Sequence, residues 1–527
     1  MIRTHVLALA VAVSAVLPGS AYAVTQPAHD EPFVTDPAIA PSLATARLAG
    51  SPAAAALSRT LASLPIDGTA QEIKERSVLI EFYEARENAP LWMTETGWTK
   101  PALAVIEEFK KAKDWGLEPQ DFVVPKLATA EDADLDIDDG AIADAEVALS
   151  AAILKYARYA RGGRIIDPTI LLNSNLDRKP KLLDPRSVIE DIATSDSTGA
   201  FLRGLHPQHP QFEKLRQAYL NTKNARTAKM LRANMEIWRW MPEDLGALHI
   251  FANVPEFMVH LVKGGERVYS ERIVVGEVGK QTTIFTRNLK TIVFKPMWRV
   301  PESIKVRELW PDLRRNASMW REHGLELESK DGVPLDYRQF DWSKTDIRDF
   351  EVVQPPGPKN VMGVVKFTFP SQHTIFMHDT IDKWMFGQKR RTLSHGCLRL
   401  RNPMRLVEKV LAEDKGWDSA KIRQVFTDGG RNNEIVIDRE IPVHLVYFTA
   451  WIDDKGDVQR FADVYGHEKR IVQALDGEWD KIDVGRDHLA PVKPVEANKV
   501  ASPGRRTTGK KGESIVDMVG NALGGGF

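Results

Sequence analysis

The chain changes its sequence periodicity once, at Met241, and this change constrains the fold more than any other feature. Upstream of it, apolar residues recur at the spacing of one helix face, as Leu231 and Met235 do. Downstream come short runs rich in β-branched and aromatic residues, such as HIFANV, RIVVG and KTIVFKPMW. We therefore predict an α+β protein, with an N-terminal all-α scaffold domain over residues 66–241 and a mainly β domain over residues 247–447.

The β-rich part contains one long interruption, from about residue 299 to residue 360, before strand patterns return in GVVKFTF and HTIFMHD. A long excursion between strands can cover a binding site, so we predict that this segment is a helical lid insertion. Residues 448–483 follow the β domain and are predicted to form a hairpin extension that turns near Lys455.

The two ends of the chain differ in composition from the part between them. Residues 1–23 hold an early cation, a short apolar run and a small-residue end at Ala23, which is typical of a secretory signal peptide. Residues 24–65 are rich in Ala, Pro, Ser and Thr, and we predict a linker there. Residues 484–527 are rich in Pro, Gly and Lys and locally basic, which favours a disordered tail, either solvated or in contact with an anionic wall or membrane surface.

These features predict where the protein acts and exclude some classes of partner. A signal peptide implies export, and we expect the mature protein in the periplasm, associated with the cell wall. No other stretch approaches the roughly 18 consecutive apolar residues of a transmembrane helix, so no transmembrane segment is expected. The formal net charge of −1 gives no overall attraction to nucleic acid.

Cys397 is the only cysteine among the 527 residues. A single cysteine cannot form an internal disulfide, so it is either an inert buried thiol or a reactive one. Its surroundings, RRTLSHGCLRLR, favour a reactive thiol, which needs a base to become a nucleophile. His395 lies two positions away and splays from it, whereas His378 ends a strand that can cross to the cysteine, so we predict His378 as the base.

The same stretch supplies further candidate groups. Gly396 allows close approach of the backbone, and the N–H groups of residues 396 and 397 are predicted to form an oxyanion hole. Arg399 returns to the face of Cys397 and can orient the loop or bind a carboxylate. Between residues 384 and 401 there are five Lys or Arg and no acid, so we expect a field that favours a thiolate and an anionic substrate.

Two motifs carry a resemblance to a known family. HDT at 378–380 and SHGCLRL at 394–400 resemble the catalytic signature of the L,D-transpeptidases, bacterial enzymes that cross-link peptidoglycan stem peptides through a cysteine. The flanking segments VPESI, GPKNVMGVVKFTFP and LRANMEIWRWMP are similar to the larger branch of that family. FYEARENAPLW and YARGGRIIDP resemble its helical scaffold domain.

The resemblance implies a role for each motif residue. Cys397 is expected to be the nucleophile and His378 its proton acceptor and donor, with the backbone carbonyl of Asp379 holding the imidazole. The supporting positions of the motif are Ser394, His395, Gly396 and Arg399. The interrupting segment would be a mobile lid over the cleft.

The resemblance also implies the reaction. The cysteine attacks the peptide bond after the third, diaminopimelate-type residue of a tetrapeptide stem and expels the terminal D-Ala, and an acceptor amine resolves the thioester. That amine is another stem peptide, an envelope protein or a free D-amino acid, and the first gives cross-links between third residues. This chemistry needs no metal or organic cofactor.

The chain departs from the family pattern at two places, and other functions stay open. Ile381 stands where the family often has Pro, and YLNTKNARTAKMLR joins the two domains without a peptidoglycan-binding module. A zinc-dependent wall hydrolase with His373, His378, His395 and Cys397 as ligands is one alternative, although the ligand spacing is unlike that of known zinc motifs. A non-catalytic wall-binding protein is another.

Overall fold

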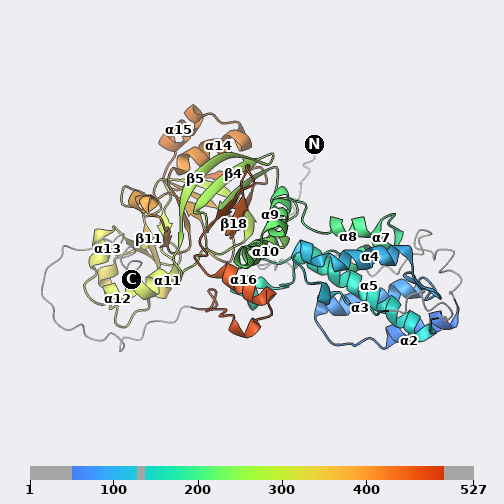
Figure 1. Cartoon of the computed structure of the whole chain (residues 1–527). Coiled ribbons are helices and arrows are strands. Elements are labelled where there is room, and N and C mark those ends of the chain that lie inside the picture. Colours follow the sequence, from blue (N-terminus) through green and yellow to red (C-terminus); the bar gives the residue numbers. More distant parts are fainter. Residues whose placement is uncertain (1–49, 127–136, 492–527) are drawn as a thin grey trace, which may run out of the picture.

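The computed structural model describes residues 50–126 and 137–491. The predicted signal peptide, most of the predicted linker and most of the basic tail lie outside these described residues. Figure 1 shows the helical part at one end of the molecule, the sheet in the middle and the insertion at the other end. The α+β fold, with a helical scaffold followed by a mainly β domain, is confirmed.

The scaffold is a helical bundle around the long helix α5. Thr69 caps α3 with a reciprocal hydrogen-bonded pair to Glu72, and Thr99 caps α4 ahead of Pro101. The buried Glu146 of α5 accepts hydrogen bonds from the backbone N–H groups that lead into a small hairpin. The elements are α2 (Pro52–Ala62), α3 (Ala70–Glu84), β1 (Met93–Thr94), β2 (Gly97–Trp98), α4 (Lys100–Lys110), η2 (Ala112–Trp115), η3 (Pro119–Asp121), α5 (Asp139–Gly162), α6 (Pro168–Leu171), α7 (Pro185–Thr194) and α8 (Thr198–Gly204).

The predicted linker over residues 24–65 is wrong in its last part. Helix α2 occupies residues 52–62, and Leu57 and Leu61 are buried in the scaffold core. The stretch is alanine-rich, Ser51 caps it and Pro52 occupies its first position, so it has strong helix propensity despite its weak periodicity. The helical domain therefore begins earlier in the chain than the sequence pattern indicated.

Two helices of the predicted scaffold pack with the β domain. They are α9 (Pro210–Asn221) and α10 (Ala225–Arg239), and Leu231, Met235 and Trp238 of α10 share one hydrophobic core with the strands. The ring of Trp238 lies 4.8 Å from that of Phe448, between centroids. These helices join the scaffold to the sheet as one packed unit.

A strongly mixed sheet forms the second domain. In the described residues its path is β16-β7-β12-β13-β15-β5-β4-β3-β17-β6, with β14 paired to β5. Helices α14 (Pro403–Lys415) and α15 (Ser419–Asp428) cover one end of it. The strands are β3 (Leu248–Asn253), β4 (Met258–Lys263), β5 (Glu266–Gly276), β6 (Thr286–Asn288), β7 (Thr291–Phe294), β12 (Val365–Thr368), β13 (Met377–His378), β14 (Thr392–Ser394), β15 (Leu398–Leu400), β16 (Asn433–Val436) and β17 (Pro442–Val446).

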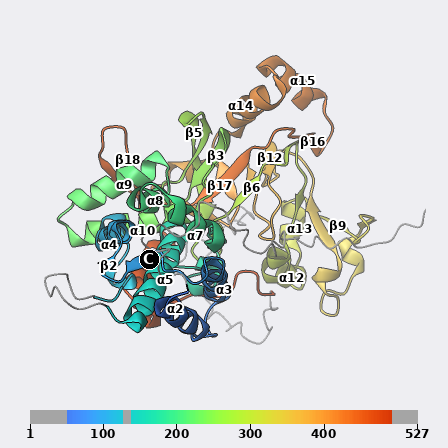
Figure 2. The same cartoon turned by 90° about the vertical axis from the view of Figure 1, so that its right-hand side faces the viewer.

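The insertion near residues 299–360 is present, and it contains short strands as well as the predicted helices. It is a small mixed unit with its own core, which includes Leu309, Trp320 and Trp342, and with the sheet order β10-β9-β11-β8. Its strands are too short to show an alternating pattern in the sequence. Figure 2 shows this unit on the opposite side of the sheet from the scaffold helices. The elements are β8 (Trp298–Arg299), α11 (Glu302–Ile304), the π-helical turn η4 (Lys305–Leu309), α12 (Trp310–Leu313), α13 (Ser318–Glu322), β9 (Glu326–Glu328), β10 (Pro334–Leu335), η5 (Tyr337–Gln339), η6 (Ile347–Asp349), β11 (Glu351–Gln354) and, beyond the insertion, η7 (Lys383–Gly387).

The C-terminal extension holds the predicted hairpin, β18 (Ala450–Ile452) with β19 (Val458–Arg460), and also α16 (His467–Leu475) and η8 (Trp479–Lys481). The prediction that disorder begins at residue 484 is wrong for residues 484–491, because Asn173 Nδ2 donates to the carbonyl of Val484 and Ser174 Oγ to that of Arg486.

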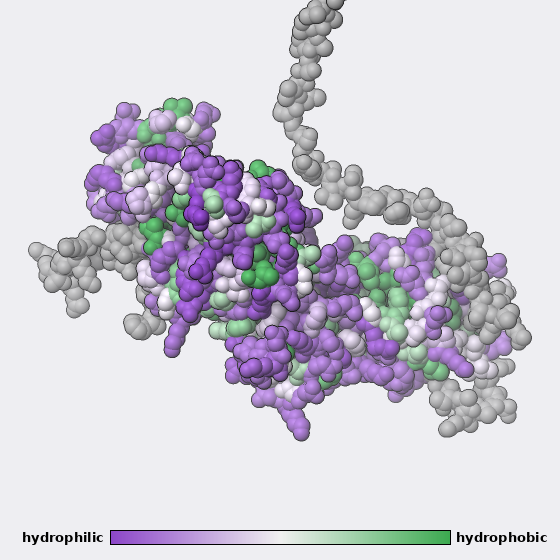
Figure 3. Space-filling model, turned by 90° about the horizontal axis from the view of Figure 1, so that it is seen from above, coloured by the Kyte–Doolittle hydropathy of each residue, from purple (hydrophilic) through white to green (hydrophobic). Residues whose placement is uncertain are grey.

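Hydrophilic side chains predominate on the face seen in Figure 3. None of the described helices combines the length and apolar character needed to cross a bilayer.

Candidate active site

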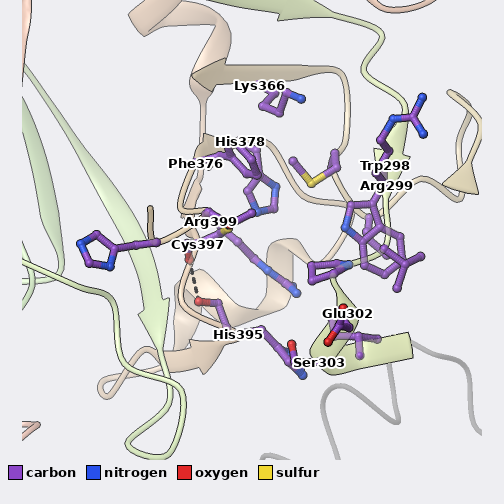
Figure 4. Close-up of a pocket in the computed structure, with 18 of the residues that line it drawn as sticks. Trp298, Arg299, Glu302, Ser303, Lys366, Phe376, His378, His395, Cys397 and Arg399 are labelled. Carbon is purple, nitrogen blue, oxygen red and sulfur yellow. Dashed lines mark hydrogen bonds between the residues drawn. The ribbon is translucent and has the colours of Figure 1, made fainter. Parts of the chain in front are cut away.

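A cavity of about 830 Å³ opens beside β13 and β15. The insertion, strand β12, the loop before β13 and the last described residues all contribute walls, and Figure 4 shows part of this lining. Five of the predicted site residues line it: His378, Ser394, His395, Cys397 and Arg399. Asp379 and Gly396 lie behind the lining and act through their backbone atoms.

Strand register places the imidazole and the thiol on the same face. Strands β13 and β15 are parallel neighbours, with His378 opposite Arg399. Because residues two apart on a strand share a face, Phe376 and His378 project to the same side as Cys397 and Arg399. The residues between them, such as Met377, are buried on the other face. The register therefore agrees with the prediction that His378 reaches toward the cysteine from a neighbouring strand.

His378 is held as a neutral base. Its Nδ1 lies 2.5 Å from the backbone carbonyl of Asp379, and a carbonyl only accepts, so Nδ1 carries the proton and Nε2 keeps a free lone pair. Burial, followed by the charge of Arg399, lowers the pKa of His378 to about 3. The Asp379 carboxylate instead accepts from the N–H of Val364 and from Lys383.

The thiol of Cys397 is partly exposed to the cavity, and its Sγ lies 3.9 Å from the carbonyl of Thr374. Burial raises the pKa of Cys397 above that of an ordinary cysteine, although Arg399 and Lys366 act in the opposite direction. The positive field therefore acts in the expected direction, but the effect of burial on the pKa of Cys397 is larger. Of the five cations counted in the sequence, Lys389 and Arg390 are exposed, and Arg391, Arg399 and Arg401 have partners of their own.

Arg399 orients a loop, and the Nη1 end of its guanidinium is occupied by this role. Its side chain is 8% exposed, and Nη1 donates to Asp382 at 2.8 Å and to Thr380 Oγ1 at 3.3 Å. This buried ion pair fixes the segment that follows HDT. Of the two roles left open by the sequence, the structure supports the first.

The loop that carries Cys397 is braced from inside. Ser394 Oγ donates to the carbonyl of Cys397 at 2.6 Å and accepts from the N–H of Gly396, while Thr282 Oγ1 donates to the carbonyl of Gly396. Gly396 has φ of +112°, a conformation that other residues rarely adopt. One of the two predicted oxyanion donors, the N–H of Gly396, is thus occupied. The N–H of Cys397 has no hydrogen-bond partner in the part of the chain that the structure describes.

His395 connects the cysteine loop to the insertion. Its Nε2 lies 3.1 Å from the carboxylate of Glu308, which belongs to η4, and Lys280 Nζ joins the same cluster. The structure therefore favours loop bracing over substrate contact for His395. This cluster joins the insertion directly to the segment that carries the nucleophile.

The side chain of His373 is buried. It is 1% exposed and bonds Asp177 through Nε2 and His488 through Nδ1, both at 2.8 Å. His488 in turn bonds Ser174. This chain, which we call the His373–His488 latch, joins the scaffold, the cavity loop and the C-terminal segment. Separations of 115 to 314 positions leave no sequence signal for it.

The four ligands of the zinc alternative do not converge. His373 bonds Asp177 and His488, His395 bonds Glu308, and His378 bonds a backbone carbonyl. Among the described residues, no group of three or more His, Cys, Asp or Glu side chains is placed to hold a metal. This geometry does not support a zinc site built from these residues.

Two cations of the cavity escaped the sequence analysis, Lys366 on β12 and Arg299 on β8. A signal for the first existed, because Lys366 alternates with the buried Val365 and Phe367 and so faces away from the core. No local signal marks Arg299, which reaches the cavity through the fold of the insertion.

Two family models match the chain. One, a scaffold domain, matches residues 77–218, and the other, an L,D-transpeptidase catalytic domain, matches residues 247–425. A protein of Haemophilus influenzae that carries the provisional name L,D-transpeptidase is 23% identical over 417 residues, which cover 78% of this chain and 82% of that protein. The order of the two domains agrees with the observed fold and with the position of the cavity. The chain belongs to the L,D-transpeptidase family, in the branch that carries a scaffold domain ahead of the catalytic domain.

Proposed function

We propose that this protein is a peptidoglycan L,D-transpeptidase that uses Cys397 as nucleophile and His378 as general acid and base. The observation that carries the proposal is the parallel register of β13 and β15, which sets both side chains on the face that lines the cavity. The carbonyl of Asp379 supports it by leaving Nε2 as the unprotonated nitrogen of the ring.

The dyad is neutral at rest, so proton transfer accompanies attack. Nε2 of His378 takes the thiol proton while sulfur bonds to the carbonyl carbon of the third stem residue. The developing oxyanion can accept from the N–H of Cys397, which has no other partner among the described residues. The carbon–nitrogen bond then breaks, His378 returns the proton to the amine of the departing D-Ala, and a thioester remains.

An acceptor amine completes the reaction. His378 removes a proton from this amine as its nitrogen attacks the thioester carbonyl, and the same proton returns to the departing sulfur. The proposed acceptor is the side-chain amine of another stem, which gives a cross-link between third-position diaminopimelate residues. Attachment of an envelope protein uses the same chemistry with a different amine. Both reactions take place at the cell wall, in the periplasm.

The test compares the natural protein with Cys397→Ser and His378→Gln on a synthetic tetrapeptide that ends in D-Ala. Mass spectrometry should detect a covalent thioester and free D-Ala for the natural protein only, because serine is a much weaker nucleophile in a site with a neutral base. Thermal unfolding of each variant serves as the control for folding. Release of D-Ala by Cys397→Ser at the rate of the natural protein would contradict the proposal and favour a metal-dependent alternative.

Digests of cell walls then identify the acceptor. Cells that lack the protein should lose cross-links between third residues if the acceptor is a stem peptide. Loss of peptide-linked envelope protein, with these cross-links unchanged, would assign the alternative acceptor instead.

A further inference from the structure

One cation in the cavity has no ion-pair or hydrogen-bond partner among the described residues. Three Lys or Arg residues line the cavity: Arg299, Lys366 and Arg399. Arg399 pairs with Asp382, and Arg299 lies 3.5 Å from Glu328. Lys366 forms no ion pair or hydrogen bond with any residue that the structure describes.

Strand register places Lys366 beside the reacting groups. Strands β12 and β13 are antiparallel, with Lys366 directly opposite His378, and His378 is opposite Arg399 on the next strand. The three side chains therefore form one row across the sheet, on the cavity face. The ammonium lies over the ring of Phe376, 5.1 Å from its centroid, and Phe376 precedes His378 on the same face. Figure 4 shows Lys366 on the same side of the cavity as Phe376 and His378.

The charge of Lys366 is poorly compensated in this position. The side chain is half-buried, and burial lowers its pKa. Glu434, the acid that acts most on it, is two strands away on β16 and exposed. A half-buried cation without an ion-pair partner costs free energy unless a ligand supplies the opposite charge, so such a group in a cavity indicates a binding site.

We propose that Lys366 binds a carboxylate of the donor stem peptide, next to the bond that Cys397 attacks. This inference rests on the proposed function and extends it to a residue outside the HDT and SHGC motifs. The carboxylate belongs either to the side chain of the third residue or to another residue of the stem, including the departing D-Ala. Arg399 is less available for this role, because Nη1 of its guanidinium is already paired with Asp382.

The experiment measures kcat/KM for thioester formation by the natural protein, Lys366→Met and Lys366→Arg. The substrates are the free-acid tetrapeptide and a set in which each of its carboxylates is amidated in turn. Methionine keeps the length of the side chain and removes its charge, and arginine restores the charge. Lys290→Met, at an exposed position outside the cavity, is the matched control.

We expect Lys366→Met to lower kcat/KM for the free acid by about ten- to a hundredfold, the range for a hydrogen bond to a charged group. Amidation of the recognised carboxylate should cause the same loss in the natural protein and no further loss in Lys366→Met. Lys366→Arg should recover most of the rate. The amidated substrate on which the natural protein and Lys366→Met have the same kcat/KM identifies the carboxylate that Lys366 binds.

Three outcomes would overturn the inference: an unchanged rate for Lys366→Met, an equal loss on every substrate, or a natural protein indifferent to every amidation. The last comparison needs no variant, so a folding defect in Lys366→Met would leave the test intact. Failure of the natural protein to form a thioester with any substrate would instead contradict the proposed function itself.

Discussion

The Arg399–Asp382 ion pair allows a quantitative test of the role assigned to Arg399. Asp382→Asn keeps the shape of the side chain and removes its charge. The two side chains are 8% and 5% exposed, and their charged atoms lie 2.8 Å apart. Removal of one partner from a buried pair leaves an uncompensated charge and typically costs about 3–5 kcal/mol. Since asparagine can still accept one hydrogen bond, we expect a loss near the lower end, about 3 kcal/mol.

Urea unfolding followed by tryptophan fluorescence measures this loss. The matched control is Glu413→Gln, because Glu413 pairs with Lys263 in the same domain but at the surface, where such pairs contribute about 0–1 kcal/mol. The double variant Asp382→Asn with Arg399→Met should recover most of the stability, since it leaves no buried charge. A cost below about 1 kcal/mol for Asp382→Asn would refute the reasoning and return Arg399 to the role of a carboxylate ligand.

Three further predictions concern other parts of the molecule. Because burial raises the pKa of Cys397, its thiolate fraction at pH 7 lies below that of an ordinary thiol. The rate of its alkylation by iodoacetamide should therefore increase with pH through a midpoint above that of free cysteine. A midpoint below that of free cysteine would contradict this direction of the pKa shift. His488→Ala breaks the His373–His488 latch beside a cavity wall, so we expect a larger change in KM than in kcat. Steady-state kinetics with KM and kcat both unchanged would contradict the contribution of the latch to the cavity wall. Leu57→Ala should destabilise the scaffold by about 2–5 kcal/mol in urea unfolding, whereas a cost near zero would restore the linker prediction.

The sequence by itself determined the features that depend on neighbouring residues. Helical and strand periodicities divided the chain into its two parts, and HDT with SHGCLRL identified the family and its candidate nucleophile and base. Local signals failed where they were short or ambiguous. The apolar face of helix α2 consists mostly of alanine, within a segment rich in Ala, Pro, Ser and Thr, and the strands of the insertion were two to four residues long.

Only the tertiary structure decided which charges meet. Five cations near Cys397 predicted a stabilised thiolate. In the structure Arg399 is paired with Asp382, and burial raises the pKa of Cys397 more than the nearby cations lower it. The unpaired cation, Lys366, comes from a strand about thirty positions upstream, and His488 comes from a segment predicted to be disordered. The physical reason is that electrostatics and burial depend on distance in space. That distance is set by strand order and chain path, which local sequence patterns do not encode.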